Sequence, residues 1–118
     1  MPQSLQELYC YNNQLVEIPP NLPQSLQKLD CSGNKLVELP EDLSQSLLEL
    51  DCGDNNLTEL PNLPQSLQKL DCNHNNLVEL PNLPQSLQKL YCHNNNLVEL
   101  PQNLPQSLQE LYCYNNQL

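Results

Sequence analysis

One short motif recurs six times in this chain and restricts the folds open to it. The motif L-x-x-L-x-C-x-x-N-x-L begins at Leu5, Leu26, Leu47, Leu67, Leu87 and Leu108. Successive copies are 21, 21, 20, 20 and 21 residues apart. A unit of about 20 residues is too short to bury its own apolar side chains, so units of this kind stack and share one core. The period therefore predicts a solenoid.

The repeat runs from Pro2 to Leu118 without a break, which predicts a single domain over residues 1–118 with no distinct caps. About six units are expected, the last of them partial. Their boundaries are 1–21, 22–42, 43–62, 63–82, 83–103 and 104–118.

Apolar and polar residues alternate around each cysteine, as in a short strand. In the first unit, Leu8 and Cys10 are expected to point inward, and Tyr9 and Tyr11 outward. Stacked in register, such strands form a parallel sheet. Its outward side chains make up a surface that we call the concave face.

The return segment of each unit carries proline at two nearly fixed places, as at Pro81 and Pro84. Proline fixes φ and disfavours the helical region for the residue before it. The convex side is therefore predicted to be extended or polyproline-like, with little or no α-helix. A 3₁₀ turn capped locally by Ser86 is expected before the next strand.

An asparagine follows every strand at the point where the chain turns inward. Its amide can satisfy backbone groups of the turn, so we expect a structural ladder. The ladder comprises Asn13, Asn34, Asn55, Asn75, Asn95 and Asn116. Each of these residues is preceded by a type that tolerates turn geometry.

The six cysteines stand at one position of the repeat: Cys10, Cys31, Cys52, Cys72, Cys92 and Cys113. Spaced a full unit apart, they are predicted to be a buried column of small apolar side chains, without disulfides or catalytic thiols. His74 and His93 do not share a face with them, so no metal site and no cofactor are expected. A reduced cysteine column favours the cytoplasm or another reducing compartment.

The chain has 14 acidic residues against four lysines, a formal charge of −10. Such a charge repels phosphate backbones and anionic lipids, so neither nucleic acid nor a membrane is an expected partner.

Three outward columns are the candidate binding residues. The column before each cysteine holds Tyr9, Asp30, Asp51, Asp71, Tyr91 and Tyr112. The column after it supplies Tyr11, His93 and Tyr114, and the column beside them holds three glutamates and three lysines. Stacked aspartates favour a basic protein segment, and tyrosines are frequent hot spots. The plainer interpretation is a solvated face that Lys28 and Lys69 partly neutralise, with tyrosines packed only on one another.

Residues 2–15 and 105–118 are identical, so both ends are expected to present the same open strand edge. Open edges recruit further chains, which predicts a homo-oligomer formed through exposed solenoid ends. A monomer with frayed ends is the alternative.

The full pattern L-x-x-L-x-C-x-x-N-x-L-x-x-L-P, with a second proline in L-P-Q-S-L, resembles the short bacterial type of leucine-rich repeat. It is similar to the repeats of IpaH/YopM-like effectors. The resemblance implies a right-handed solenoid, a protein-binding role without enzymatic activity, and action in a host cytosol if the chain is an effector. No residue matches the catalytic domain of the ligase-type effectors. The competing hypothesis is a structural or self-assembling array, natural or of consensus design, with no ligand on its concave face.

Overall fold

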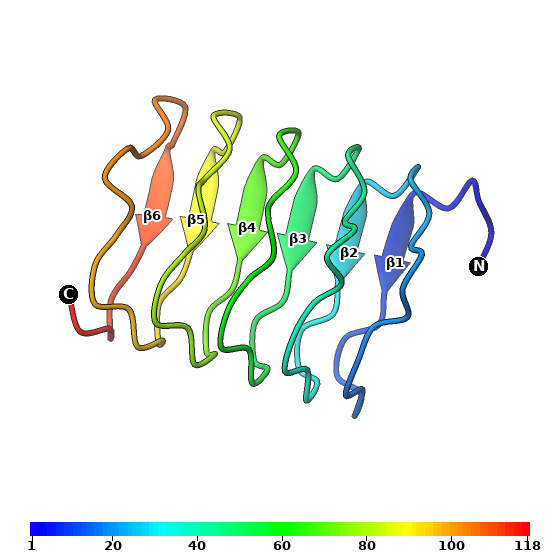
Figure 1. Ribbon diagram of the computed structural model, residues 1–118, viewed down its shortest axis with the longest axis horizontal. Helices are drawn as coiled ribbons and strands as arrows, with labels where there is room; N and C mark the ends of the chain where they lie inside the picture. The colour runs from blue at the N-terminus through cyan, green and yellow to red at the C-terminus, as the bar shows by residue number, and fades with distance from the viewer.

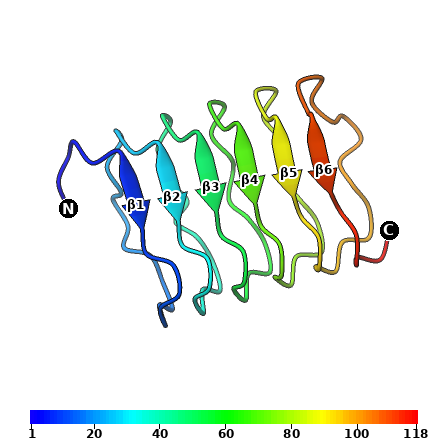
Figure 2. The ribbon, with the colours of Figure 1, turned by 180° about the vertical axis from the view of Figure 1, so that it is seen from behind.

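The computed structural model describes residues 1–118 and is a solenoid with one parallel sheet along its length (Figure 1). The strands are β1 Glu7–Tyr9, β2 Lys28–Asp30, β3 Glu49–Asp51, β4 Lys69–Asp71, β5 Lys89–Tyr91 and β6 Glu110–Tyr112. They pair in sequence order, one strand from each coil. The return segments run on the opposite side of the solenoid from the sheet, as the two views show (Figure 2). The predicted fold class is confirmed, and no helix long and apolar enough to cross a membrane is present.

Each strand begins one residue earlier than the alternation predicts and ends at the residue before the cysteine. The interstrand hydrogen bonds nevertheless continue. The N–H of Cys10 donates to the carbonyl of Asp30 at 2.8 Å, and that of Asn12 donates to the carbonyl of Ser32 at 2.9 Å. Asn12 then adopts a φ of 55°, and the chain turns away from the sheet two residues after the cysteine.

A left-handed residue occupies this position in every coil. The column consists of Asn12, Gly33, Asp54, His74, Asn94 and Asn115, with φ between 52° and 66°. Asn, Asp, His and Gly are enriched in this region of φ, whereas β-branched residues are strained there. The composition of the column is therefore explained by backbone geometry.

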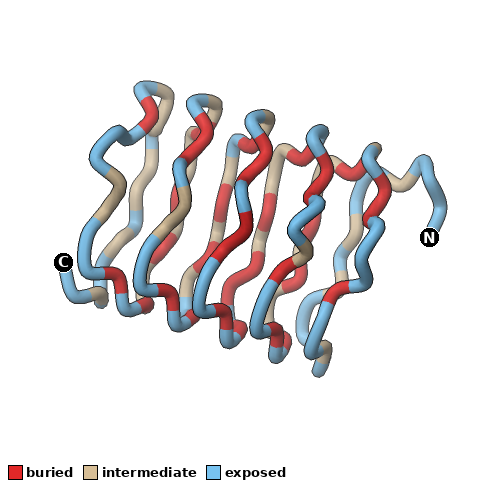
Figure 3. Tube along the Cα trace, in the orientation of Figure 1, coloured by how far each residue is buried: buried red, intermediate tan, exposed pale blue.

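One continuous core of 23 buried apolar side chains lies between the sheet and the return segments (Figure 3). Leu26, Leu47, Leu67 and Leu87 occupy equivalent sites and are at most 1% exposed. Their counterparts in the terminal coils, Leu5 and Leu108, are half-buried, as each has a neighbouring coil on one side only.

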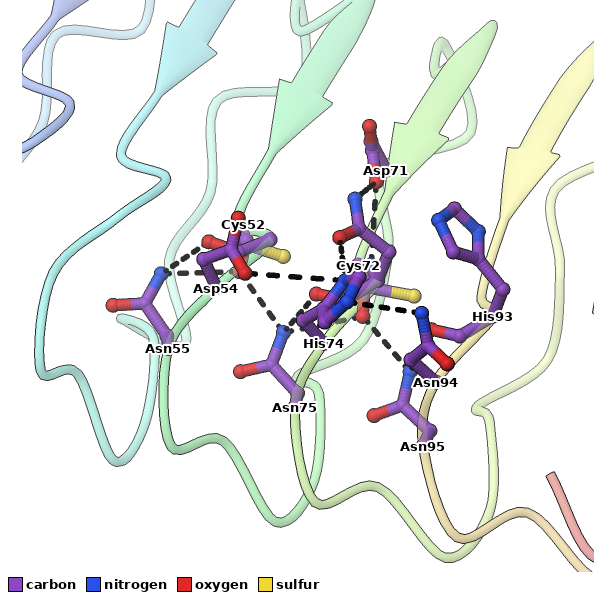
Figure 4. A network of polar contacts seen from close by, with 12 residues as sticks. Cys52, Asp54, Asn55, Asp71, Cys72, His74, Asn75, His93, Asn94 and Asn95 are labelled. Carbon is purple, nitrogen blue, oxygen red and sulfur yellow. Dashed lines mark hydrogen bonds and ion pairs between the residues drawn. The ribbon is translucent and has the colours of Figure 1, made fainter. Parts of the chain in front are cut away.

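The asparagine side chains bond both within their own coil and to the preceding one (Figure 4). The amide Nδ2 of Asn75 donates to the carbonyls of Cys52, Cys72 and Asn73, each at 3.1 Å. Its Oδ1 accepts from the N–H of Leu57 at 3.0 Å. Asn34, Asn55, Asn95 and Asn116 repeat this arrangement. Asn13 has no preceding coil and donates only to the carbonyls of Cys10 and Tyr11.

All six cysteines are free thiols, and the four inner ones are buried. Cys10 and Cys113 are only half-buried, unlike the buried column predicted, because they lie in the terminal coils. Burial raises the pKa of Cys31 and Cys92 to about 12 and that of Cys52 and Cys72 well above its ordinary value. The inner cysteines are therefore protonated at neutral pH and act as core residues.

The segment before each strand forms one hydrogen-bonded turn, such as Leu87 N–H to Pro84 carbonyl at 3.1 Å, and no 3₁₀-helix. Ser86 does not cap this turn locally. Its hydroxyl lies within 2.7 Å and 2.6 Å of the carbonyls of Gln65 and Leu67 in the preceding coil. The serine therefore links coils, because each return segment lies directly beside the one before it.

Candidate functional site on the concave face

The sheet register brings the predicted binding residues together on one surface. Tyr9 pairs with Asp30, Asp30 with Asp51, and Asp51 with Asp71. The row then continues through Tyr91 to Tyr112. An acidic centre with tyrosines at both ends is thus present along the concave face.

A shallow hollow of about 280 Å³ lies over the first half of this face. Its walls include Tyr9 and Tyr11 at one end, Asp30 and Asp51 in the middle, and Lys69 at the other end. Aromatic, acidic and basic groups therefore meet in one concavity.

The three aspartates differ in how well their own coil satisfies them. Asp30 accepts from the N–H and hydroxyl of Ser32 at 3.1 Å and 2.7 Å. Asp71 accepts from the N–H and side-chain amide of Asn73. Asp51 accepts only from the N–H of Gly53, at 3.1 Å, since glycine has no side-chain donor. The residue two positions after each aspartate is the sequence signal for this difference, and the alternation pattern alone overlooks it.

The environment of Asp51 opposes its negative charge. Burial raises its pKa to about 6, and the charges of Asp71 and Asp30 act in the same direction. The hydrogen bond from Gly53 and the charge of Lys69 lower the pKa and offset part of that rise. Asp51 is thus the least stabilised carboxylate of the row.

No lysine forms an ion pair with the aspartate row. Lys28 lies 3.8 Å from Glu49, and Lys89 lies 3.7 Å from Glu110. The Nζ atom of Lys69 sits 5.9 Å from the centre of the Tyr91 ring, a cation–π distance. The lysines therefore pair mainly within their own column and with an aromatic ring.

Replacing Asp51 with asparagine is expected to stabilise the protein at pH 7 by about 1 kcal/mol, after allowance for screening at this half-exposed site. The folded-state pKa lies above the ordinary value of 3.8, so unfolding releases a proton between about pH 4 and 6. The stability of the parent consequently falls as pH rises through that window. Urea denaturation at pH 4 and pH 7 tests this, and a gain of equal size at both pH values would contradict it.

The second half of the face carries a cluster of aromatic rings. Tyr91 and Tyr112 lie 4.7 Å apart, and His93 stacks on Tyr114 at 4.6 Å. The hydroxyl of Tyr91 donates to Glu110 at 2.5 Å, and this bond is the main cause that raises the pKa of Tyr91 to about 12. Tyr112 and Tyr114 remain 46% and 55% exposed, and Tyr9 and Tyr11 56% and 51%. The tyrosines therefore pack partly on one another and still present ring surface to solvent.

The two histidines belong to different surroundings (Figure 4). His74 Nδ1 lies 2.6 Å from the Oδ1 of Asn73, and its Nε2 lies 2.9 Å from the amide of Asn94. This pattern assigns the proton of the neutral ring to Nδ1. His93 instead joins the tyrosine cluster, and no group of three His, Cys, Asp or Glu side chains is arranged to hold a metal ion.

Comparison with known proteins places these features in a family. A profile described as leucine-rich repeats in two copies matches residues 3–45, and a single leucine-rich repeat profile matches 66–87 and 86–106. The chain therefore belongs to the leucine-rich repeat family. No curated protein sequence matches it significantly.

Solved structures of bacterial effectors share its fold. The leucine-rich repeat domain of a Shigella effector is 39% identical with a TM-score of 0.91, over 95% of this chain and 50% of that one. The leucine-rich effector YopM of Yersinia pestis is 35% identical with a TM-score of 0.80, over 97% of this chain and 37% of that one. The chain thus spans about half the length of the first structure and less of the second. The predicted resemblance is confirmed.

Proposed function

We propose that this chain is a non-enzymatic protein-binding module whose concave face receives a segment of another protein. The observation that carries the proposal is the row Asp30, Asp51 and Asp71, which has no lysine partner and lies between two groups of exposed tyrosines. Side chains held on a regular sheet lose little entropy when they contact a partner. Rigid aromatic rings beside unpaired charges are typical of binding hot spots.

The proposed ligand carries lysine or arginine. Asp51 stays largely ionised at neutral pH although burial and its acidic neighbours oppose the charge. A cationic side chain in the hollow would offset the repulsion among the three carboxylates, and the adjacent rings of Tyr9 and Tyr11 would contact it through their faces. The destabilised carboxylate and the rings together favour a basic segment over an acidic or purely apolar one.

Selection from a random peptide display library tests this function and requires no known partner. We expect the selected peptides to be enriched in lysine and arginine. Asp51→Lys is expected to weaken their binding at least tenfold, because it places a cation where the ligand cation would lie. Tyr11→Ala, at an exposed ring with no hydrogen bond, should weaken it several-fold.

Glu41→Lys serves as the matched control, since it makes the same charge change at an exposed site away from the concave face. Denaturation curves for each variant would show that the fold is retained. Equal binding by the parent, Asp51→Lys and Tyr11→Ala would refute the proposed site. A library that yields no binder would favour the structural-array hypothesis instead.

A further inference from the structure

A second surface, on the return side of the solenoid, is not involved in the proposed function. Each of five coils exposes a β-branched residue followed by a glutamate, and we call these pairs the Val-Glu flank. The flank consists of Val16–Glu17, Val37–Glu38, Thr58–Glu59, Val78–Glu79 and Val98–Glu99. The four valines are 52–65% exposed, unlike the leucine and isoleucine residues on either side of each pair. Figure 3 shows exposed stretches that recur along the return segments.

The backbone beside the flank is hydrogen-bonded from coil to coil, which fixes its spacing. The carbonyls of Leu15, Leu36, Leu57, Leu77 and Leu97 directly precede the pairs. Each accepts from an N–H of the next coil at 2.8–2.9 Å. Such a ladder repeats at about 4.8 Å per coil. The flank is therefore a regular double row, one apolar and one acidic.

Most of the acidic surplus of the protein lies outside the concave face. That face holds six carboxylates and three lysines, a formal charge of −3, out of −10 for the chain. The remaining −7 comes from eight carboxylates and Lys35. The five flank glutamates supply most of those carboxylates, and none of them forms an ion pair or a side-chain hydrogen bond. An unpaired acidic row beside exposed valines is complementary to a surface that is both basic and apolar.

We infer that the Val-Glu flank binds a basic amphipathic helix of a partner protein, aligned with the solenoid axis. On a helix, basic residues at i, i+4, i+7 and i+11 lie on one face and are about 5.4 Å apart along the axis, one turn per step. This step is about 0.6 Å longer than the spacing of about 4.8 Å between successive flank glutamates. Lysine and arginine side chains absorb such a difference over the four steps between the five glutamates. An extended strand places same-face residues about 6.8 Å apart, a mismatch of about 2 Å per step. The spacing therefore selects a helix over a strand.

The probe for this surface is a synthetic helical peptide of about 16 residues, with one row of lysines at the spacing above and an adjacent row of leucines. Fluorescence anisotropy measures its binding to the full chain. Removing three flank charges by Glu38→Gln, Glu59→Gln and Glu79→Gln is expected to weaken binding about tenfold, since each exposed pair contributes modestly. Val37→Ser with Val78→Ser should also weaken it.

The matched control removes three carboxylates elsewhere, through Glu41→Gln, Asp42→Asn and Asp54→Asn, and should change binding less than about twofold. A scrambled peptide of the same composition should bind more weakly than the probe. Equal losses for the two triple variants, or equal binding of the scrambled peptide, would overturn the inference in favour of diffuse charge attraction. A loss on Asp51→Lys would overturn it as well, because the helix would then occupy the concave face. These tests of the flank do not depend on whether the concave face binds a basic segment.

Discussion

Replacing Asn75 with alanine is expected to lower the free energy of unfolding by about 4 kcal/mol. The substitution removes three hydrogen bonds to the carbonyls of Cys52, Cys72 and Asn73. These carbonyls keep one donor each, from Asn55 Nδ2, Asn95 Nδ2 and the N–H of Asp54, whereas the N–H of Leu57 loses its acceptor. These groups lie inside the solenoid, where water does not replace the lost partners. Urea denaturation followed by circular dichroism measures the loss.

Two alanine variants are controls for this prediction. Asn76 is the next residue along the chain, is exposed and makes no side-chain hydrogen bond, so Asn76→Ala should be nearly neutral. Asn13 occupies the equivalent ladder position in the first coil and makes only two exposed bonds, so Asn13→Ala should cost about 1 kcal/mol. If Asn75→Ala were no more destabilising than Asn76→Ala, the ladder would not be what holds the turns together.

Leu67→Ala is expected to reduce the free energy of unfolding by about 3 kcal/mol. Leu67 is 0% exposed and lies in the middle of the continuous core. The substitution removes apolar contacts and leaves a cavity that the hydrogen-bonded coils on both sides are poorly able to close. A thermal or urea unfolding curve gives the size of the effect.

The same substitution in the first coil tests whether the loss of stability comes from burial between two coils or from a general sensitivity of this repeat position to alanine. Leu5 holds the equivalent position but is half-buried with one neighbouring coil, so Leu5→Ala should cost about 1 kcal/mol. Equal losses at the two positions would show that burial between two coils is not the source of the stability.

The two proposed surfaces use the same scaffold in different ways. On the concave face, three lysines reduce the net charge, and the distinctive features are one destabilised carboxylate and a set of exposed rings. The Val-Glu flank is uniform from coil to coil and almost free of positive charge. We therefore expect the concave face to select a ligand by its amino-acid sequence. We expect the flank to select a ligand by the regular spacing of its basic residues.

The period of the sequence predicted the solenoid, apolar–polar alternation predicted its parallel sheet, and the fixed prolines predicted the lack of helix. A unit of about 20 residues has few ways to bury five or six apolar side chains. The alternation of apolar and polar residues predicted Tyr9 and Tyr11 outside and Leu8 inside, because successive side chains of a strand point to opposite faces. It placed the start of the strand one residue too late and its end two residues too late, because alternation does not detect the turn into which the hydrogen-bonded ladder continues. It also did not indicate that Cys10 and Cys113 are half-buried.

Sequence by itself determined which side chains share a column, since the repeat spacing fixes the register between coils. Only the tertiary structure decided how neighbouring columns interact. Pairing of Lys28 with Glu49 and the stacking of His93 on Tyr114 both depend on side-chain rotamers and on burial between coils. The free Val-Glu flank likewise became visible only when the coils were stacked, because a residue is known to be unpaired only after every neighbour has been placed.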